Sequence, residues 1–189
     1  MKKLFVLGIA VLFLSGCIGV SPKADFYTLQ TVQAKPVTQV SMQVAVEPVK
    51  IPAFLDRPQI VTLKENNISL NFSETSRWAE SLSDLLQRTL INDLTVLMPQ
   101  SVIVPKTFSR TDAKVIVFVD VNQFDAVLGQ RLTFGARWSL IDQNGNTIYQ
   151  TQTVISKDIT TDYSDLVLKQ SEIMGQLSTQ IAKRIALIR

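Results

Sequence analysis

One side chain near the N-terminus stands in a pattern that predicts covalent modification. Cys17 is the only cysteine of the chain and ends the motif Leu14-Ser15-Gly16-Cys17. A basic start at residues 1–3 and an apolar run over residues 4–14 precede it. A helix that spans a bilayer needs about 20 residues, so this run predicts a secretion signal rather than a membrane anchor. In an exported protein, a lone thiol needs a partner or a modification.

The motif resembles the lipobox of bacterial lipoproteins. In that class the cysteine receives a diacylglycerol, the chain is cut before it, and the new amine is often acylated. The resemblance implies a diacylglycerol and an N-acyl chain on Cys17 and no other cofactor, and two or more buried acyl chains give stable anchoring. The alternative is an ordinary secretory signal followed by an unrelated cysteine. Ile18 stands where Asp would imply retention at the inner membrane, so the resemblance implies the outer membrane of a Gram-negative cell, facing the periplasm.

Length and charge limit the class of protein. We expect residues 1–16 to be a signal peptide, residues 17–24 a lipidated tether and residues 25–189 a single α/β domain, because the 173 mature residues suffice for one core. The mature side chains carry 17 basic and 16 acidic groups. This near-neutral balance argues against a nucleic-acid partner, since such proteins usually carry a basic stripe.

The chain contains no histidine. This excludes Ser-His-Asp and Cys-His catalysis, and with Cys17 acylated it also excludes zinc held by His or Cys. Carboxylate dyads, Ser–Lys pairs and oxygen-ligated calcium stay open in principle. The candidates are dispersed acids and one helix-surface pair, for which we expect solvated structural roles: Asp120, Asp125, Asp142, and Ser164 with Lys169. We therefore predict neither catalytic residues nor a metal site.

Hydrophobic periodicity predicts the fold class. Period-two alternation and turn residues predict strands at residues 26–29, 43–49, 60–64, 68–72, 101–105, 113–127, 131–141 and 147–159. Two helices follow from apolar stripes, one from an N-cap at Ser76 to Pro99, the other from a cap at Asp162 or Ser164 to the C-terminus. The order predicts an α/β (α+β) protein with a single mixed, largely antiparallel sheet and two long amphipathic helices.

Two short segments carry charged residues whose roles we interpret from the sequence. Asp56 and Arg57 lie on a loop stiffened by Pro52 and Pro58, so they are candidates for contact with a partner. The alternative, which we favour from the sequence, is a local ion pair between Arg57 and a carboxylate. The segment 77–80 (Arg-Trp-Ala-Glu) is predicted to open the first helix, with its tryptophan in the core and its glutamate near the positive helix N-terminus.

Together, several motifs resemble those of one family. They follow the lipobox in order: Phe26-Tyr27-Thr28-Leu29, Val44-Ala45-Val46-Glu47-Pro48-Val49, Phe54-Leu55-Asp56-Arg57-Pro58-Gln59-Ile60-Val61 and Arg77-Trp78-Ala79-Glu80-Ser81-Leu82. In sequence and spacing they resemble the PqiC-type lipoproteins, auxiliary components of ABC-type and MCE (mammalian cell entry) lipid-transport systems. The resemblance covers nearly the whole mature chain.

The resemblance implies a fold and partners. The fold would be similar to the anticodon-binding-like and TolB N-terminal folds. The partner would be an MCE-domain, tube-forming (PqiB-like) protein of the inner membrane, whose distal end this lipoprotein would receive. Outer-membrane lipids and a homo-oligomeric ring are the further implied partners. The family has no established catalytic residues to carry over.

Three functions compete at this point. The leading hypothesis is a non-enzymatic docking subunit for intermembrane phospholipid transport that supports membrane integrity. The alternative is a structural lipoprotein that stabilises an outer-membrane assembly without a role in lipid transport. A hydrolase using only Asp, Glu, Ser and Lys is disfavoured by the absence of histidine and of a motif.

Overall fold

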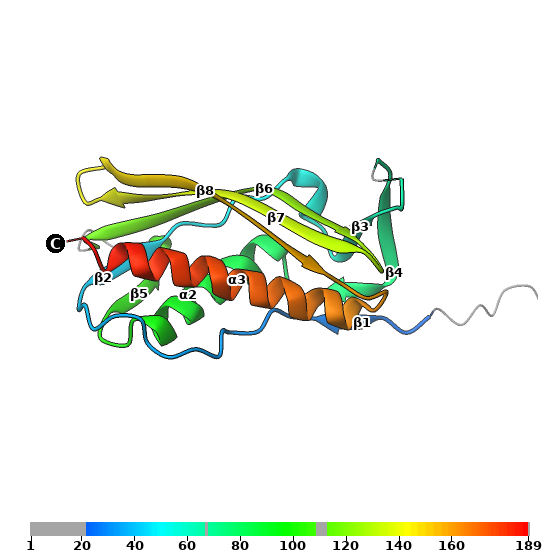
Figure 1. Cartoon of the computed structure of the whole chain (residues 1–189), viewed down its shortest axis with the longest axis horizontal. Helices are drawn as coiled ribbons and strands as arrows, with labels where there is room; N and C mark the ends of the chain where they lie inside the picture. The colour runs from blue at the N-terminus through cyan, green and yellow to red at the C-terminus, as the bar shows by residue number, and fades with distance from the viewer. Residues whose placement is uncertain (1–21, 67, 109–112, 189) are drawn as a thin grey trace, which may run out of the picture.

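The computed structural model describes residues 22–66, 68–108 and 113–188. It shows one mixed sheet with two long helices packed against one face (Figure 1). The strands are β1 (Asp25–Tyr27), β2 (Gln43–Val46), β3 (Gln59–Leu63), β4 (Leu70–Trp78), β5 (Val102–Pro105), β6 (Val115–Val127), β7 (Arg131–Asp142) and β8 (Thr147–Asp158). The helices are α2 (Leu82–Leu97) and α3 (Tyr163–Ile185), with short 3₁₀ helices η1 (Ala53–Leu55) and η2 (Lys106–Phe108). The predicted fold class is confirmed.

The longest strand, β6, organises the sheet. One of its edges pairs antiparallel with β7, and β7 pairs antiparallel with β8. Its other edge is shared, because β2 pairs parallel with its start and β3 pairs parallel with its end, at Leu63 and Val127. Strand β5 lies beyond β2, and β4 and β1 lie beyond β3. On this side the sheet therefore splits into two lobes, and the β2–β3 connection lies between them.

The alternation predicted for β6 to β8 is what the structure shows. Alternate valines of β6, from Val115 to Val121, are buried in the core that the helices complete, and the residues between them are half-exposed on the open face. The β7–β8 turn has Gly145 at φ +86°, a left-handed conformation that glycine adopts without strain. The carboxylate of Asp142 accepts the backbone N–H of Asn144 and of Asn146 in this turn.

Both helices begin at side-chain caps and bury an apolar stripe. The Ser81 hydroxyl accepts the Asp84 N–H at the start of α2, and the Asp162 carboxylate accepts the Ser164 N–H at the start of α3. Of the two predicted N-caps of this helix, Asp162 rather than Ser164 is therefore the one that the structure shows. Within the described residues, no helix combines the length and hydropathy that crossing a membrane would need.

The predicted start of the first helix is wrong. Ser76 is not its N-cap, because β1 pairs in parallel with Ser76–Trp78 and extends β4 through these residues. Trp78 is therefore a strand residue, although its predicted place in the core is confirmed at 4% exposure. Glu80 precedes the helix and forms an ion pair with Arg88, which lies within α2.

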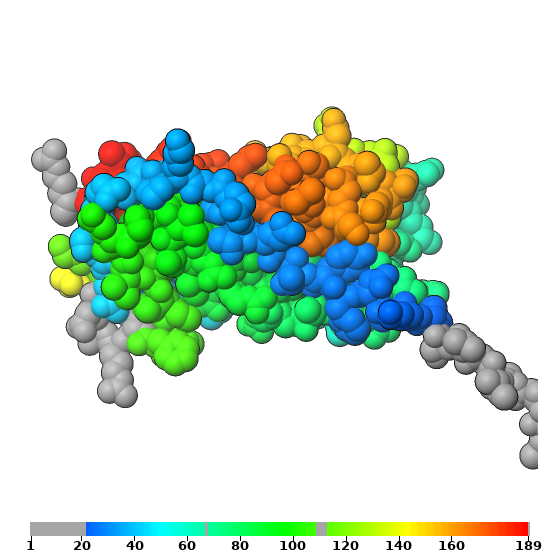
Figure 2. All heavy atoms as spheres, turned by 90° about the horizontal axis from the view of Figure 1, so that it is seen from below, coloured from blue at the N-terminus to red at the C-terminus, as the bar shows by residue number. Residues whose placement is uncertain are grey.

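A segment without regular structure, residues 28–41, runs across both helices, and we call it the strap (Figure 2). Its backbone bonds to each helix, since Val37 N–H donates to the carbonyl of Leu97 at 2.9 Å and Gln30 N–H donates to the Ser171 hydroxyl at 3.0 Å. A Cβ on Gly175 of α3 would lie 2.8 Å from the Val32 side chain, so only glycine allows this approach. The strap is therefore fixed to both helices along its length.

Candidate docking site

The predicted lipidation motif lies outside the described residues. Cys17 and its preceding Leu14, Ser15 and Gly16 therefore stay predictions, as do the signal peptide and tether boundaries. The described chain begins at Pro22, three residues before β1. In Figure 1, β1 and the β3–β4 hairpin lie at one end of the elongated molecule and the C-terminus of α3 lies at the other. A tether from Cys17 would thus leave from the β1 end.

The loop that carries Asp56 and Arg57 is fixed along its length. Before it, the Lys50 carbonyl accepts the Val121 N–H of β6 at 2.9 Å. Within it, the N–H of the buried Leu55 donates to the Pro52 carbonyl at 2.9 Å. After it, the Pro58 carbonyl accepts the Trp78 N–H at 2.7 Å. The backbone of the loop is therefore held in place, which lowers the entropy cost of binding.

Arg57 packs on an aromatic ring rather than on an acid. Its guanidinium carbon lies 4.3 Å from the centroid of the Phe72 ring, a cation–π contact. Its Nε is buried and has no hydrogen-bond partner. Among the described residues, neither Arg57 nor Asp56 takes part in an ion pair. The local ion pair considered above is thus not formed there, and Asp56 is exposed.

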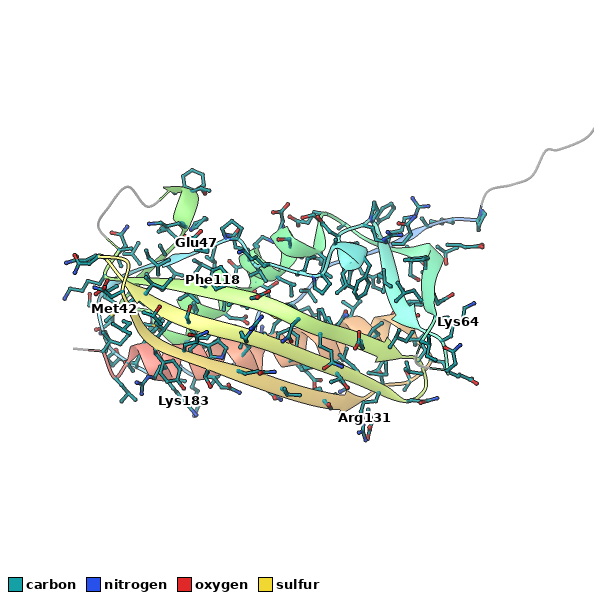
Figure 3. The ribbon with its side chains drawn as sticks, turned by 90° about the horizontal axis from the view of Figure 1, so that it is seen from above. Met42, Glu47, Lys64, Phe118, Arg131 and Lys183 are labelled. Carbon is teal, nitrogen blue, oxygen red and sulfur yellow. The ribbon has the colours of Figure 1, made fainter. Side chains whose placement is uncertain are left out.

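Two surface hollows meet at Asp56. One, of about 350 Å³, is lined by residues 56–58 and 78–81. The other, of about 610 Å³, is lined by residues 47–51 together with Asp56 and the β6 side chains Phe118 and Asp120. Figure 3 shows Glu47 and Phe118 close together beside the split in the sheet. An aromatic side chain with charged residues around it matches the apolar centre and polar rim of a protein interface.

Two charged side chains of the second hollow, Lys50 and Asp120, interact with other residues of this protein. The Lys50 ammonium lies 4.9 Å from the Phe118 ring centroid. The carboxylate of Asp120 lies 3.5 Å from the guanidinium of Arg137 on β7. Asp56 and Glu47 are therefore the two acids of this hollow that the described residues leave without an ion-pair partner.

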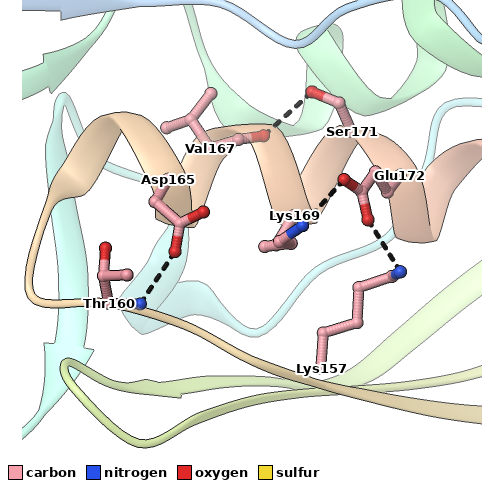
Figure 4. A network of polar contacts seen from close by, with 7 residues as sticks. All are labelled: Lys157, Thr160, Asp165, Val167, Lys169, Ser171 and Glu172. Atoms are coloured by element: carbon pink, nitrogen blue, oxygen red, sulfur yellow. Dashed lines mark hydrogen bonds and ion pairs between the residues drawn. The ribbon is translucent and has the colours of Figure 1, made fainter.

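A second charged cluster joins α3 to β8 (Figure 4). The Glu172 carboxylate accepts the ammonium groups of Lys157 at 2.7 Å and Lys169 at 2.9 Å. These hydrogen bonds lower the pKa of Glu172, and the bond to Glu172 raises the pKa of Lys169. Ser164 lies at the start of α3, where its N–H donates to the carboxylate of the N-cap Asp162. Lys169 is thus engaged with Glu172, and the cluster stabilises the contact between helix and sheet.

The dispersed acids have separate structural partners. Asp120 faces Arg137, Asp125 accepts the Gln123 amide at 2.8 Å, and Asp142 closes the β7–β8 turn. Hydrogen bonds from Asn146 and Asn144 lower the pKa of Asp142. Within residues 22–66, 68–108 and 113–188, no three His, Cys, Asp or Glu side chains are grouped as a metal would require.

The sequence reasoning missed one buried acid. Asp93 of α2 is fully buried and accepts the Val32 N–H of the strap at 2.7 Å and the Ser178 hydroxyl of α3 at 2.8 Å. Burial raises the pKa of Asp93, and the two hydrogen bonds oppose this shift. The available signal was its spacing, because Leu86, Leu90, Asp93 and Leu97 lie on one helical face.

The fold and its family are defined by comparison with known proteins. Residues 27–182 match the family model of the ABC-type transport auxiliary lipoprotein component, so the chain belongs to this family. Among its relatives is the intermembrane transport lipoprotein PqiC of Escherichia coli (strain K12), 23% identical over 188 residues, with 98% of each chain covered. PqiC of Shigella flexneri matches with the same identity and coverage. The predicted PqiC-type family is confirmed.

Two solved structures share the fold. One, described as a crystal structure of an uncharacterized protein, matches with a TM-score of 0.72 and 20% identity over 87% of this chain and 99% of that one. The other, protein XCC0632 from Xanthomonas campestris, matches with a TM-score of 0.73 and 14% identity over 87% of this chain and 95% of that one. At these identities the likeness supports the fold alone.

Proposed function

We propose that this protein is a non-enzymatic outer-membrane lipoprotein that docks an MCE-type transport protein and supports phospholipid traffic between the two membranes. The observation that carries the proposal is the match to transport auxiliary lipoproteins over residues 27–182, together with the end-to-end similarity to proteins named intermembrane transport lipoprotein. Acyl chains on Cys17 would hold it in the outer membrane with the domain in the periplasm. Docking would then contribute to membrane integrity by completing the route for lipid.

The loop at Asp56 and Arg57 is the surface we assign to docking. It is fixed at both ends, it presents an unpaired acid, and it lies between two hollows. An MCE tube built from identical subunits has rotational symmetry, so a lipoprotein at its end binds either as a ring of copies or as one copy on one subunit. The ring is the natural match, and the loop then contacts either the tube or the neighbouring copy.

The anchor is tested by Cys17→Ser. We expect the native chain to incorporate a palmitate analogue in cells and to fractionate with the outer membrane. The variant should take up no label and should be uncleaved or soluble, because serine lacks the thiol that is acylated. A matched control moves the thiol out of the motif to the next serine of the chain, in the double variant Cys17→Ser/Ser21→Cys, which should also stay unlabelled. Labelling of Cys17→Ser would show that the lipobox prediction is wrong.

The docking loop is tested by a charge swap, Asp56→Arg with Arg57→Asp. We expect the swapped protein to keep its far-UV circular dichroism and a cooperative unfolding transition, and to lose most of its binding to the MCE protein or its self-association, measured by pull-down and sedimentation. The control is the same swap at Arg131 and Asp158, an exposed ion pair on the opposite side of the sheet. Unfolding of the first variant would make the pair structural. A folded variant that binds and assembles normally would exclude this loop as the contact.

A further inference from the structure

Strands β1, β5 and β8 are the outermost strands of the described part of the sheet, and they differ in length. Strand β1 has three residues, and β5 has four and ends in Pro105. Strand β8 has twelve residues, and its only strand partner among the described residues is β7. Its residues 147–156 contain neither a charged side chain nor a proline. Natural sheets usually protect edges by short strands, charge or proline, so the edge of β8 is open to strand addition.

Helix α3 runs beside this edge and is fixed to it. Three contacts at four-residue spacing along β8 hold strand and helix together: Tyr149 under Arg184, Thr153 with Gln180, and Lys157 with Glu172. The last of these is drawn in Figure 4. The edge and the flank of α3 therefore form two walls of one groove, and binding need not order either wall.

Two hollows lie along the groove. The first, of about 330 Å³, has an aromatic wall in which the Trp138 and Tyr149 ring centroids are 5.2 Å apart. The exposed Leu187 also lines it. The second, of about 600 Å³, lies between α3 and strap residues 30–33, meets β8 at Lys157 alone and includes the exposed Leu168. Alternate side chains of a strand point to the same face, so an added strand would direct every second side chain toward the first hollow and, at its Lys157 end, toward the border of the second.

The charge of the first hollow selects the partner. Its lining includes Lys183 and Arg184 and no acidic residue. Lys183 is exposed, and the Nε of Arg184 is buried without a hydrogen-bond partner. Two full positive charges outweigh the roughly half negative charge at a helix C-terminus. The groove thus complements a carboxylate at this end.

We propose that the groove between the free edge of β8 and α3 binds an extended, acidic segment of a partner protein, which adds to the sheet as a strand. Backbone hydrogen bonds to β8 supply affinity, apolar side chains at every second position enter the hollows, and an acidic side chain meets Lys183 and Arg184. The site lies on the opposite side of β6 from the Asp56 loop. This proposal goes beyond the docking function proposed above, because it does not depend on which transport system the lipoprotein serves.

The test uses a library of random peptides about twelve residues long, displayed on phage and selected on the full-length lipidated protein in detergent. We expect enriched peptides with alternating apolar positions and at least one acid. When one is added, those backbone amides of residues 147–156 that point away from β7 should become protected from hydrogen exchange. Lys183→Glu should weaken its binding by about tenfold, because a contact charge is reversed. Lys64→Glu, at the far end of the molecule in Figure 3, makes the same charge change and should leave binding unaltered.

Three results would overturn the proposal. One is that no peptide is enriched, or that enriched peptides protect amides outside residues 147–156. Another is that Lys183→Glu and Lys64→Glu weaken binding equally, which would show that the net charge of the protein, and not a contact at Lys183, causes the effect. The third is that the amides of this outer edge are already protected in the free protein, which would assign the edge to a second copy of this chain. Exchange of these amides in the free protein, in the ring proposed above as well as in a monomer, is the result we expect.

Discussion

A buried carboxylate joins three segments of the chain at the scale of single residues. Asp93 lies on α2, and its two oxygens reach the strap at Val32 and α3 at Ser178. The Ser178 hydroxyl also lies 2.8 Å from the carbonyl of Met174. A buried charge is costly unless it is hydrogen-bonded, and here two donors oppose the effect of burial on the pKa.

We expect Asp93→Asn to make stability less dependent on pH. Because burial raises the pKa of Asp93, the folded protein holds this proton to higher pH than the unfolded chain does. The stabilisation from proton binding is complete below the ordinary carboxyl pKa of about 4 and is lost as pH rises through the higher folded value. Asparagine stays neutral, accepts the Val32 N–H through Oδ1 and donates to Ser178. Its free energy of unfolding, from urea titrations between pH 4 and 8, should therefore exceed that of the native protein increasingly as pH rises.

Asp93→Ala is the matched comparison. It removes both hydrogen bonds and leaves the Val32 N–H without its partner, so it should destabilise the fold by about 2–3 kcal/mol. An asparagine variant with the same pH dependence as the native protein would contradict the assignment of the raised pKa to Asp93.

Single residues differ in how far the sequence reveals their role. The motif ending at Cys17 is local, so its chemistry can be predicted without a fold. The exposure of Asp56 follows from the prolines around it, but the contact of Arg57 with Phe72 depends on a distant strand. The role of Asp93 depends on the strap and α3 meeting at one point, and no local pattern encodes that meeting.

At the scale of elements, the strands with clear alternation are the ones predicted well. The hairpin of β7 and β8 follows from period-two patterning and an Asn-Gly turn, both of which are local. The parallel contacts of β2 and β3 with β6 join residues more than 60 positions apart, so local patterns do not predict them. The first helix starts later than predicted, since both Ser76 and Ser81 suit an N-cap and pairing with β1 decides between them.

The position of the helix start can be measured. Ser81→Ala removes the hydroxyl that accepts the Asp84 N–H, so it should lower the free energy of unfolding by about 1 kcal/mol. Ser76→Ala is the matched control, because Ser76 is a strand residue and caps no helix. We expect it to cost well under half as much in urea titrations of both variants. A larger loss for Ser76→Ala would place the helix start at the earlier serine.

At the scale of the whole molecule, the surfaces are arranged around one rigid sheet. The N-terminal segment that leads back to Cys17 leaves at the β1 end, and the C-terminus of α3 lies at the opposite end (Figure 1). The Asp56 loop and the β8 groove lie on opposite sides of β6. A molecule anchored through Cys17, as proposed above, would be able to meet one partner at the Asp56 loop and another at the β8 groove.

The most direct test of the docking function is lipid transfer between two vesicle populations. Donor vesicles carry the MCE protein and a fluorescent phospholipid, and acceptor vesicles carry this lipoprotein through its acyl chains. We expect the native lipoprotein to join the vesicles and raise the rate of transfer, and the swapped Asp56 and Arg57 variant to do neither. The swap at Arg131 and Asp158 should behave like the native protein. Equal transfer with and without the lipoprotein on the acceptor vesicles would contradict its role in docking the transport protein.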